Sequence, residues 1–138
     1  ISAFAEKKDL AGQPYFEHLD RVASKFNDLI LIQAAYLHDL LEDCPEWTID
    51  HIKQLFHKNV ALLLVLLTKQ HGEDYFSYIR RIKSDYDAVK IKRADLEDNL
   101  NLLRLQMKPE LSDTDLKRIQ KYHKALYILN FEKEVPNG

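Results

Sequence analysis

The sequence predicts an all-α protein. Only three of its 138 residues are glycine and four are proline, so few positions force the chain out of a helix. Apolar residues recur at intervals of three and four along the whole chain, which is the spacing of one helical face. The alternation of apolar and polar residues that is typical of a half-buried strand persists nowhere. Helices alone are therefore expected.

Composition favours one domain covering residues 1–138, which is long enough to bury a core without disulfides. The single cysteine, Cys44, excludes a disulfide framework and suits a reducing compartment. A formal net charge of −2 provides no basic field for nucleic acid. The longest apolar run, residues 60–67, is too short to cross a bilayer, and no signal segment opens the chain. We expect a soluble, cytoplasmic protein without nucleic-acid or membrane partners.

The N-terminal third is expected to hold three helices. Residues 2–8 form a short helix, and the next helix, residues 14–26, begins at a proline, which suits the first helical position. His18 lies on the apolar face of that helix, where a histidine is more often a core residue than a metal ligand. Asn27 or Asp28 caps the third helix, residues 29–41. The apolar face of the second helix is made of Phe16, Leu19, Val22, Ala23 and Phe26.

Three shorter helices follow in the middle of the chain. Thr48 caps the fourth helix, Asn59 can cap a fifth over residues 60–68, and Asp74 caps a sixth over residues 75–83 after a turn at Gly72. The fourth helix is expected to turn Ile49, Ile52, Leu55 and Phe56 inward. His51 and His57 are expected at the surface. The sixth carries Arg80, Arg81 and Lys83, which face either solvent or a phosphate.

Two long helices complete the bundle. The seventh covers residues 86–106, and Asp95, Asp98 and Asn99 interrupt the middle of its apolar stripe. The last begins at Ser112 with Asp115, a pattern of reciprocal capping. Its expected core stripe is Leu116, Ile119, Tyr122 or His123, Leu126 and Leu129. The apolar stripes of these two helices are expected to complete the hydrophobic core of the bundle.

Four ionisable side chains stand inside the apolar run at residues 35–43. On one helix His38 would lie one turn from Glu42, and Asp39 one turn from Asp43. Imidazole and carboxylate groups bind divalent Mn, Fe, Co or Zn, and a cation would offset the charge of a partly buried acidic cluster. The alternative is a solvated helix end. His18 and Asp95, on two other helices, favour the metal.

Three segments together resemble the HD superfamily of metal-dependent phosphohydrolases, and within it the single-domain alarmone hydrolases of the Rel/Spo type. Residues 12–18, GQPYFEH, are similar to that family's G-x-P-Y-x-x-H. Residues 34–43, AAYLHDLLED, are similar to its A-A-x-L-H-D-x-x-E-D. Residues 92–99, KRADLEDN, are similar to its K-x-A-D-x-x-x-N. Thr68-Lys69 and Tyr122 are also in register, so the resemblance covers nearly the whole chain.

The resemblance implies a compact HD-type helical bundle with one manganese ion, although other divalent transition metals also suit these residue types. The implied metal ligands are His18, His38, Asp39 and Asp95. Glu42 and Asp43 are implied to orient and deprotonate the attacking water. The implied substrate-binding residues are Lys7, Lys8, Asn99 and Tyr122.

The resulting expectation is an enzyme that hydrolyses the 3′-pyrophosphate of (p)ppGpp with a metal-activated water. The chain departs from the family where it has Lys7 in place of arginine, Asp98 in place of a neutral or aromatic residue, and Leu102 in place of threonine. These departures motivate a second expectation, an HD phosphohydrolase for another nucleotide. A third is a regulatory module that contains a metal and binds a nucleotide without cleaving it. Lys7 and Lys8 can also be ordinary solvent-exposed lysines.

Overall fold

The computed structural model describes residues 15–44, 46–101 and 109–133, with Tyr15, Phe16, Leu40 and Glu42 described by their backbone alone. Every element in these ranges is helical, and no strand occurs in them, so the predicted all-α class is confirmed. The predicted helix over residues 2–8, with Lys7 and Lys8, lies outside the described residues, and so does Leu102. The helices are α1 (Tyr15–Ala23), α2 (Leu29–Leu37), α3 (Leu40–Asp43), α4 (Ile49–Leu55), α5 (Lys58–Leu67), α6 (Tyr75–Ile82), α7 (Tyr86–Asn99) and α9 (Asp113–Asn130).

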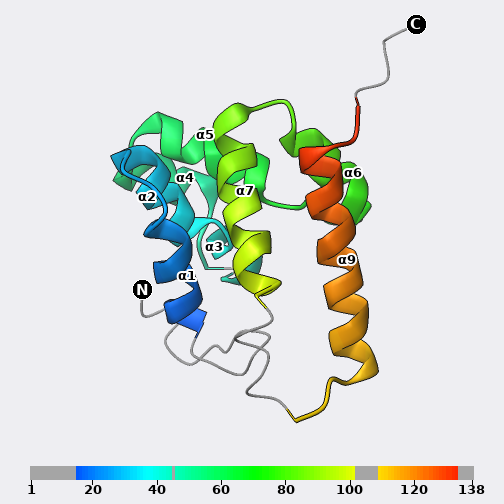
Figure 1. Cartoon of the computed structure of the whole chain (residues 1–138). Helices are drawn as coiled ribbons and strands as arrows, with labels where there is room; N and C mark the ends of the chain where they lie inside the picture. The colour runs from blue at the N-terminus through cyan, green and yellow to red at the C-terminus, as the bar shows by residue number, and fades with distance from the viewer. Residues whose placement is uncertain (1–14, 45, 102–108, 134–138) are drawn as a thin grey trace, which may run out of the picture.

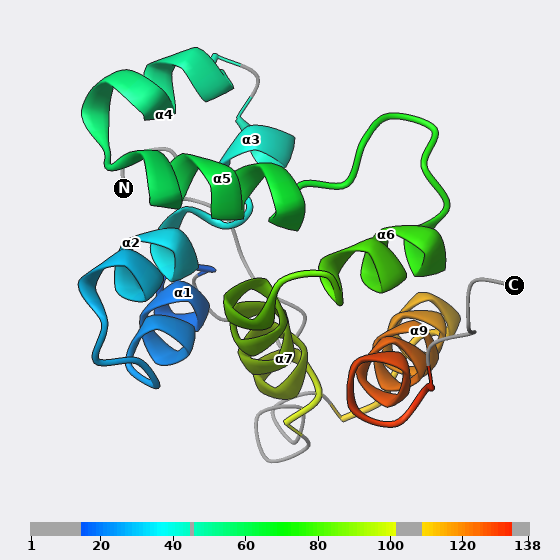
Figure 2. The ribbon, with the colours of Figure 1, turned by 90° about the horizontal axis from the view of Figure 1, so that it is seen from above.

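Helix α7 occupies the middle of the molecule (Figure 1). Seen from above in Figure 2, it lies between α1, α2 and α5 on one side and α6 and α9 on the other. It contacts α1, α2, α5 and α9 directly. A residue on α7 can therefore reach side chains from both halves of the chain.

Side-chain caps fix where most helices begin. Asp28, Thr48, Asp74 and Ser112 accept hydrogen bonds from the first turn of α2, α4, α6 and α9, as predicted. The predicted cap at Asn59 is wrong. His57 caps α5 instead, and its ring Nδ1 accepts a hydrogen bond from the backbone N–H of Asn59.

The third helix is not continuous as predicted. It is broken at His38 and Asp39, which separate α2 from α3. The ring Nδ1 of His38 lies 2.6 Å from the carbonyl oxygen of Ala35 and donates to it. That carbonyl would otherwise accept the N–H of the residue four positions later, so the side chain competes with the helical ladder. The N–H of Asp43, at the end of α3, donates to the carbonyl of Asp39 in the break at 3.0 Å.

Two other predicted ends are also corrected. Helix α1 ends at Ala23 rather than at residue 26, and two turn residues follow it. Helix α7 ends at Asn99, because Leu100 forms the cap with its N–H bonded back to Leu96 and Asp98. The predicted continuation of that helix falls mostly on residues 102–108, outside the described residues.

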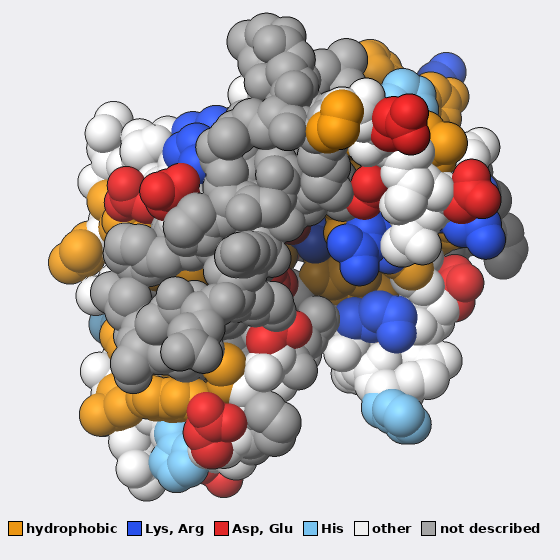
Figure 3. Space-filling view, turned by 90° about the horizontal axis from the view of Figure 1, so that it is seen from below, with side chains coloured by type: hydrophobic (Ala, Val, Ile, Leu, Met, Phe, Trp, Pro, Cys, Tyr) orange, Lys and Arg blue, Asp and Glu red, His pale blue; other side chains and the backbone are white. Residues whose placement is uncertain are grey.

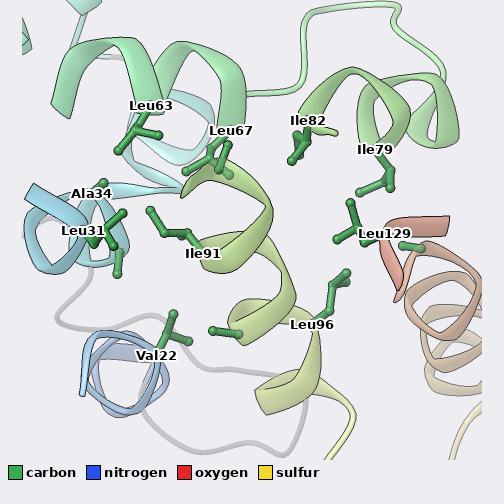
Figure 4. Packing of buried hydrophobic residues seen from close by; sticks show 14 of the residues in the cluster. Val22, Leu31, Ala34, Leu63, Leu67, Ile79, Ile82, Ile91, Leu96 and Leu129 are labelled. Atoms are coloured by element: carbon green, nitrogen blue, oxygen red, sulfur yellow. The ribbon is translucent and has the colours of Figure 1, made fainter. Parts of the chain in front are cut away.

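Two apolar clusters hold the helices together. The larger joins α1, α2, α5, α6, α7 and α9, and Figure 4 shows Ile91 extending from α7 toward Leu31 on one side and Leu96 toward Leu129 on the other. The smaller packs Cys44 and Ile52 against α1 and α5. The predicted burial of Leu55 and Leu116 is wrong, because these side chains are 63% and 52% exposed.

The basic residues of α6 are used within the fold. Arg80 pairs with Glu132, and Arg81 pairs with Glu73 while donating to the carbonyls of Leu66 and Thr68. Lys83 donates to the carbonyl of Glu132. Their contacts brace α6 rather than form a phosphate site. Among the described helices, none has the length and apolar character needed to cross a membrane.

Candidate metal centre

The structure brings together three of the four side chains predicted to hold a metal. One ligand atom each of His18, His38 and Asp95 lies within 4.8 Å of the others, and all three side chains are buried. They come from α1, from the break between α2 and α3, and from α7. Their common point is Oδ1 of Asp95, which lies 2.9 Å from Nε2 of His18 and 3.1 Å from Nε2 of His38. Two imidazole nitrogens and a carboxylate oxygen therefore face one buried space.

His38 is oriented by the same contact that breaks the helix. Because its Nδ1 donates to the carbonyl of Ala35, the neutral ring presents a lone pair at Nε2. This Nε2 is buried and has no hydrogen-bond partner, although Asp95 is near it. A buried polar atom without a partner is costly unless something else satisfies it. A cation held between this lone pair and the carboxylate would do so.

His18 lies between two carboxylates. Its Nε2 lies 2.9 Å from Asp95, and its Nδ1 lies 2.5 Å from Oδ2 of Asp98. Burial would lower the pKa of His18, but the hydrogen bonds to Asp95 and Asp98 outweigh it and raise the pKa to about 9. In the absence of a metal, His18 is therefore a cation at neutral pH. The proton on Nε2 occupies the place that a metal would take.

Asp95 stays ionised although it is buried. Burial alone would raise its pKa, but the positive charge of Lys92, together with the hydrogen bond from His18, holds the pKa of Asp95 well below its usual range. The Nζ of Lys92 lies 2.9 Å from Oδ2 of Asp95, while Oδ1 faces the two histidines. The two oxygens thus have separate partners, and Oδ1 is the one available to a metal.

Sequence reasoning gave no role to Lys92, Arg21 or Asp98. The three-residue spacing of Lys92 and Asp95 on one helix was a usable signal for their pairing. The contact of Asp98 with His18 and Arg21 had no such signal, because 80 and 77 residues separate these partners. Asp98 stood out in the sequence because it interrupts the apolar stripe and because it replaces the family's neutral or aromatic residue.

The other predicted site residues lie at varying distances from this group. The Oδ2 of Asp39 is 3.4 Å from Nε2 of His38, so Asp39 borders the centre without joining its three mutually close atoms. Asp43 is exposed on α3, and the side chain of Glu42 lies outside the described residues. Asn99 donates to Oδ1 of Asp95 at 3.3 Å. It is therefore directed at the metal centre as well as being a predicted substrate contact.

Tyr122 belongs to an aromatic and basic wall beside the centre. The Nζ of Lys121 lies over the rings of Tyr75 and Tyr122, at 4.7 and 5.3 Å from their centroids. Burial raises the pKa of Tyr75 to about 12 and also raises the pKa of Tyr122, and the charge of Asp95 adds to both shifts. These phenols therefore remain neutral beside the centre.

Positive charge is crowded along this wall. Burial lowers the pKa of Lys121, and the nearby charges of Arg118, Lys92 and Lys69 lower it further. Figure 3 shows basic side chains gathered at a hollow with hydrophobic side chains at its base. Crowded cations favour a bound anion, because an anion relieves their mutual repulsion.

The residue types and their contacts fit a divalent cation. Nitrogen and carboxylate oxygen suit Mn, Fe, Co and Zn, and the unpartnered Nε2 of His38 is a donor atom that the protein itself does not use. Each histidine has its second nitrogen fixed by another group, Ala35 for His38 and Asp98 for His18. This is the arrangement usual for histidines that bind metals.

Comparison with known proteins does not assign the chain to a family, because no family model and no curated protein matches it. The geometry of His18, His38 and Asp95 is therefore the basis for the functional conclusion.

Proposed function

We propose that the protein is a metal-dependent phosphohydrolase that removes pyrophosphate from the 3′ position of (p)ppGpp. The observation that carries this proposal is the convergence of two histidine nitrogens on Oδ1 of Asp95 in a buried space, with Nε2 of His38 left unpartnered. An HD-type hydrolase needs such a set. The resemblance of the three sequence segments supports the same reaction.

A divalent cation bound here would make a coordinated water a far stronger acid than bulk water, and so supply hydroxide near neutral pH. His18, His38 and Asp95 would hold the cation, and Asp39 adds a carboxylate beside His38. Asn99 steadies Asp95. Asp43 follows Asp39 by one turn and is open to solvent, which suits a group that passes protons to water. Glu42 shares this role in the proposal.

The neighbouring wall supports a phosphorylated substrate. Lys92 pairs with Asp95, and the charges of Arg118, Lys92 and Lys69 all act on Lys121, which a bound phosphate would stabilise. Lys121 lies over the rings of Tyr75 and Tyr122, so the wall combines positive charge with aromatic surface. The choice of (p)ppGpp among phosphorylated nucleotides rests on the sequence resemblance.

The test is release of pyrophosphate from ppGpp by protein loaded with Mn²⁺, beside a panel of other phosphorylated nucleotides. We expect GDP and pyrophosphate from ppGpp, and no product from variants His38→Gln or Asp95→Asn. His123→Gln is the matched control, because this histidine is exposed on α9, and it should retain full activity. Turnover of another nucleotide but not ppGpp would favour a phosphohydrolase that acts on that other nucleotide. A Glu42→Gln variant with unchanged hydrolysis would contradict the assigned role of Glu42.

A further inference from the structure

Asp98 is a buried carboxylate that belongs to none of the residues proposed to hold the metal. It follows Asp95 by three positions on α7, and its side chain is 5% exposed. Its Oδ2 lies 2.5 Å from Nδ1 of His18. A buried carboxylate is costly unless its charge is paired and its oxygens are hydrogen-bonded.

Arg21 provides that compensation. Its Nε donates to Oδ1 of Asp98 at 2.8 Å, and its Nη2 donates to Oδ2 at 3.2 Å. Burial would raise the pKa of Asp98, but His18 and Arg21 together lower it. Arg21 follows His18 by three positions on α1, so one turn of α1 supplies both the histidine and the cation that steadies its acceptor.

The contact decides which way the His18 ring points. An imidazole whose Nδ1–H is held by a carboxylate must present Nε2 as the atom free to bind a metal, and the carboxylate makes that nitrogen more basic. The ring of His38 is oriented instead by the backbone carbonyl of Ala35, which accepts from its Nδ1. This acceptor is neutral, and no side-chain substitution removes it. The two histidines thus differ, because only His18 depends on a replaceable charged side chain.

A simpler explanation is that Arg21 and Asp98 only tie α1 to α7. The chain contains a natural comparison for this explanation. Lys25, in the turn that follows α1, and Glu97 on α7 form a second ion pair at 3.6 Å, and both side chains are more than 40% exposed. Glu97 is adjacent to Asp98 and does not touch His18 in any described contact. A substitution at Glu97 therefore removes an ion pair to α7 without removing the contact that orients the His18 ring.

We propose that Asp98, supported by Arg21, is a positioning residue that fixes the orientation of His18 and strengthens metal binding at the centre. This inference rests on the metal centre of the proposed function but not on hydrolysis of any nucleotide. It predicts that removing the Asp98 carboxylate weakens metal binding while the helices stay in place.

The experiment measures binding of Mn²⁺ and Co²⁺ to chelator-treated full-length protein, without nucleotide. We expect Asp98→Ala to weaken affinity by roughly 10- to 100-fold, the range found for such outer partners. Asp98→Asn, which keeps an acceptor but not the charge, should lie between Asp98→Ala and the unsubstituted protein, and Arg21→Gln should weaken binding less. Glu97→Gln and Lys25→Gln should bind as the unsubstituted protein does.

A second measurement does not depend on affinity. In Zn²⁺-loaded protein, the short contact between His18 Nδ1–H and Asp98 should give a proton resonance far downfield, retained in Glu97→Gln and lost in Asp98→Ala. Folding of each variant is checked by far-UV circular dichroism. The outcomes against the proposal are equal affinity in folded Asp98→Ala, an equal loss in Glu97→Gln, or absence of metal binding by the unsubstituted protein. Weakened binding in Asp98→Ala supports it even if no nucleotide is hydrolysed.

Discussion

His18 is held by carboxylates that lie 77 and 80 residues away in the sequence. In the metal-free protein these carboxylates favour the protonated ring, so the proton and the metal compete for Nε2. Metal binding near neutral pH should consequently release a proton, as is general for histidine ligands.

The first prediction concerns the metal-free protein and pH. The pKa of His18 rises from 6.5 to about 9 on folding, so its protonated form stabilises the native state. That contribution is fully present below about pH 6.5 and is lost as the pH rises through about 9. This contribution is at most about 3.5 kcal/mol, from about 1.4 kcal/mol per pKa unit.

Urea unfolding in the presence of a chelator, across this pH range, measures the effect. The free energy of unfolding should fall toward high pH in the unsubstituted protein and fall less in His18→Asn. His123→Gln is the control, since this exposed histidine should leave the profile unchanged. A profile that is the same with and without His18 would contradict the prediction.

The second prediction concerns Asp95 and Lys92. Replacing Asp95 by Asn leaves the buried ammonium of Lys92 without its charge partner, and breaking a buried ion pair in this way costs about 3–5 kcal/mol. Adding Lys92→Met to Asp95→Asn removes the orphaned charge and should recover much of the loss. Denaturant unfolding of metal-free protein provides the comparison, and a double variant no more stable than Asp95→Asn would refute it.

At the level of elements, α7 and α9 together form the side of the centre where substrate is proposed to bind. Helix α7 supplies Asp95 and Lys92, and α9 supplies Lys121 and Tyr122. The two helices contact each other directly. Changes on α9 should therefore alter substrate binding without altering the metal centre.

The third prediction is that Lys121→Gln raises KM for ppGpp about tenfold, equivalent to about 1.4 kcal/mol, and leaves kcat nearly unchanged. Its positive charge would contribute to binding the nucleotide rather than to the reacting bond. Lys124→Gln is the matched control, because Lys124 also lies on α9 and its Nζ is 4.4 Å from the ring centroid of Phe76 on α6. Steady-state kinetics at several salt concentrations test this, and an equal change in both variants would count against it.

Most helices could be predicted because their signals are local. Asp28, Thr48, Asp74 and Ser112 cap the helices that follow them, as the sequence indicates. The break at His38 could not be predicted. It depends on the ring Nδ1 of His38 donating to the carbonyl of Ala35, which would otherwise accept a backbone N–H of the helix. The burial of Leu55 and Leu116 was also mispredicted, and both side chains are exposed. Periodicity shows which face of a helix is apolar, but it does not show whether another helix packs over every residue of that face.

At the scale of the whole molecule, apolar packing that needs no metal stabilises the fold. Two apolar clusters join the helices, and the metal centre is buried next to them, since Leu19, Ala94 and Leu96 of these clusters adjoin His18 and Asp95 in the chain. The resemblance to the HD superfamily named the three side chains, His18, His38 and Asp95, that the structure shows could hold a metal ion. Their supporting contacts could not be predicted, because the Arg21–Asp98 and His18–Asp98 pairs form only when α1 meets α7.

The fourth prediction is that removing the metal loosens the protein without unfolding it. A metal that binds only the native state stabilises it by about 2.7 kcal/mol at a hundredfold excess over its dissociation constant. Chelation should therefore lower the melting temperature by several degrees, while far-UV helicity at room temperature persists. Scanning calorimetry with and without Mn²⁺ measures this, and an unchanged melting temperature after full metal removal would contradict it.

The position of Asp95 on the central helix has one more consequence. Its histidine partners lie 77 and 57 positions earlier in the chain, so no short segment contains a working centre. Each helix can form early from local contacts, whereas these three side chains meet only after distant parts of the chain have docked, which is slow because long loops must close. During refolding, metal binding should therefore begin only when the helices have docked in their native arrangement, which is later than the formation of the helices themselves.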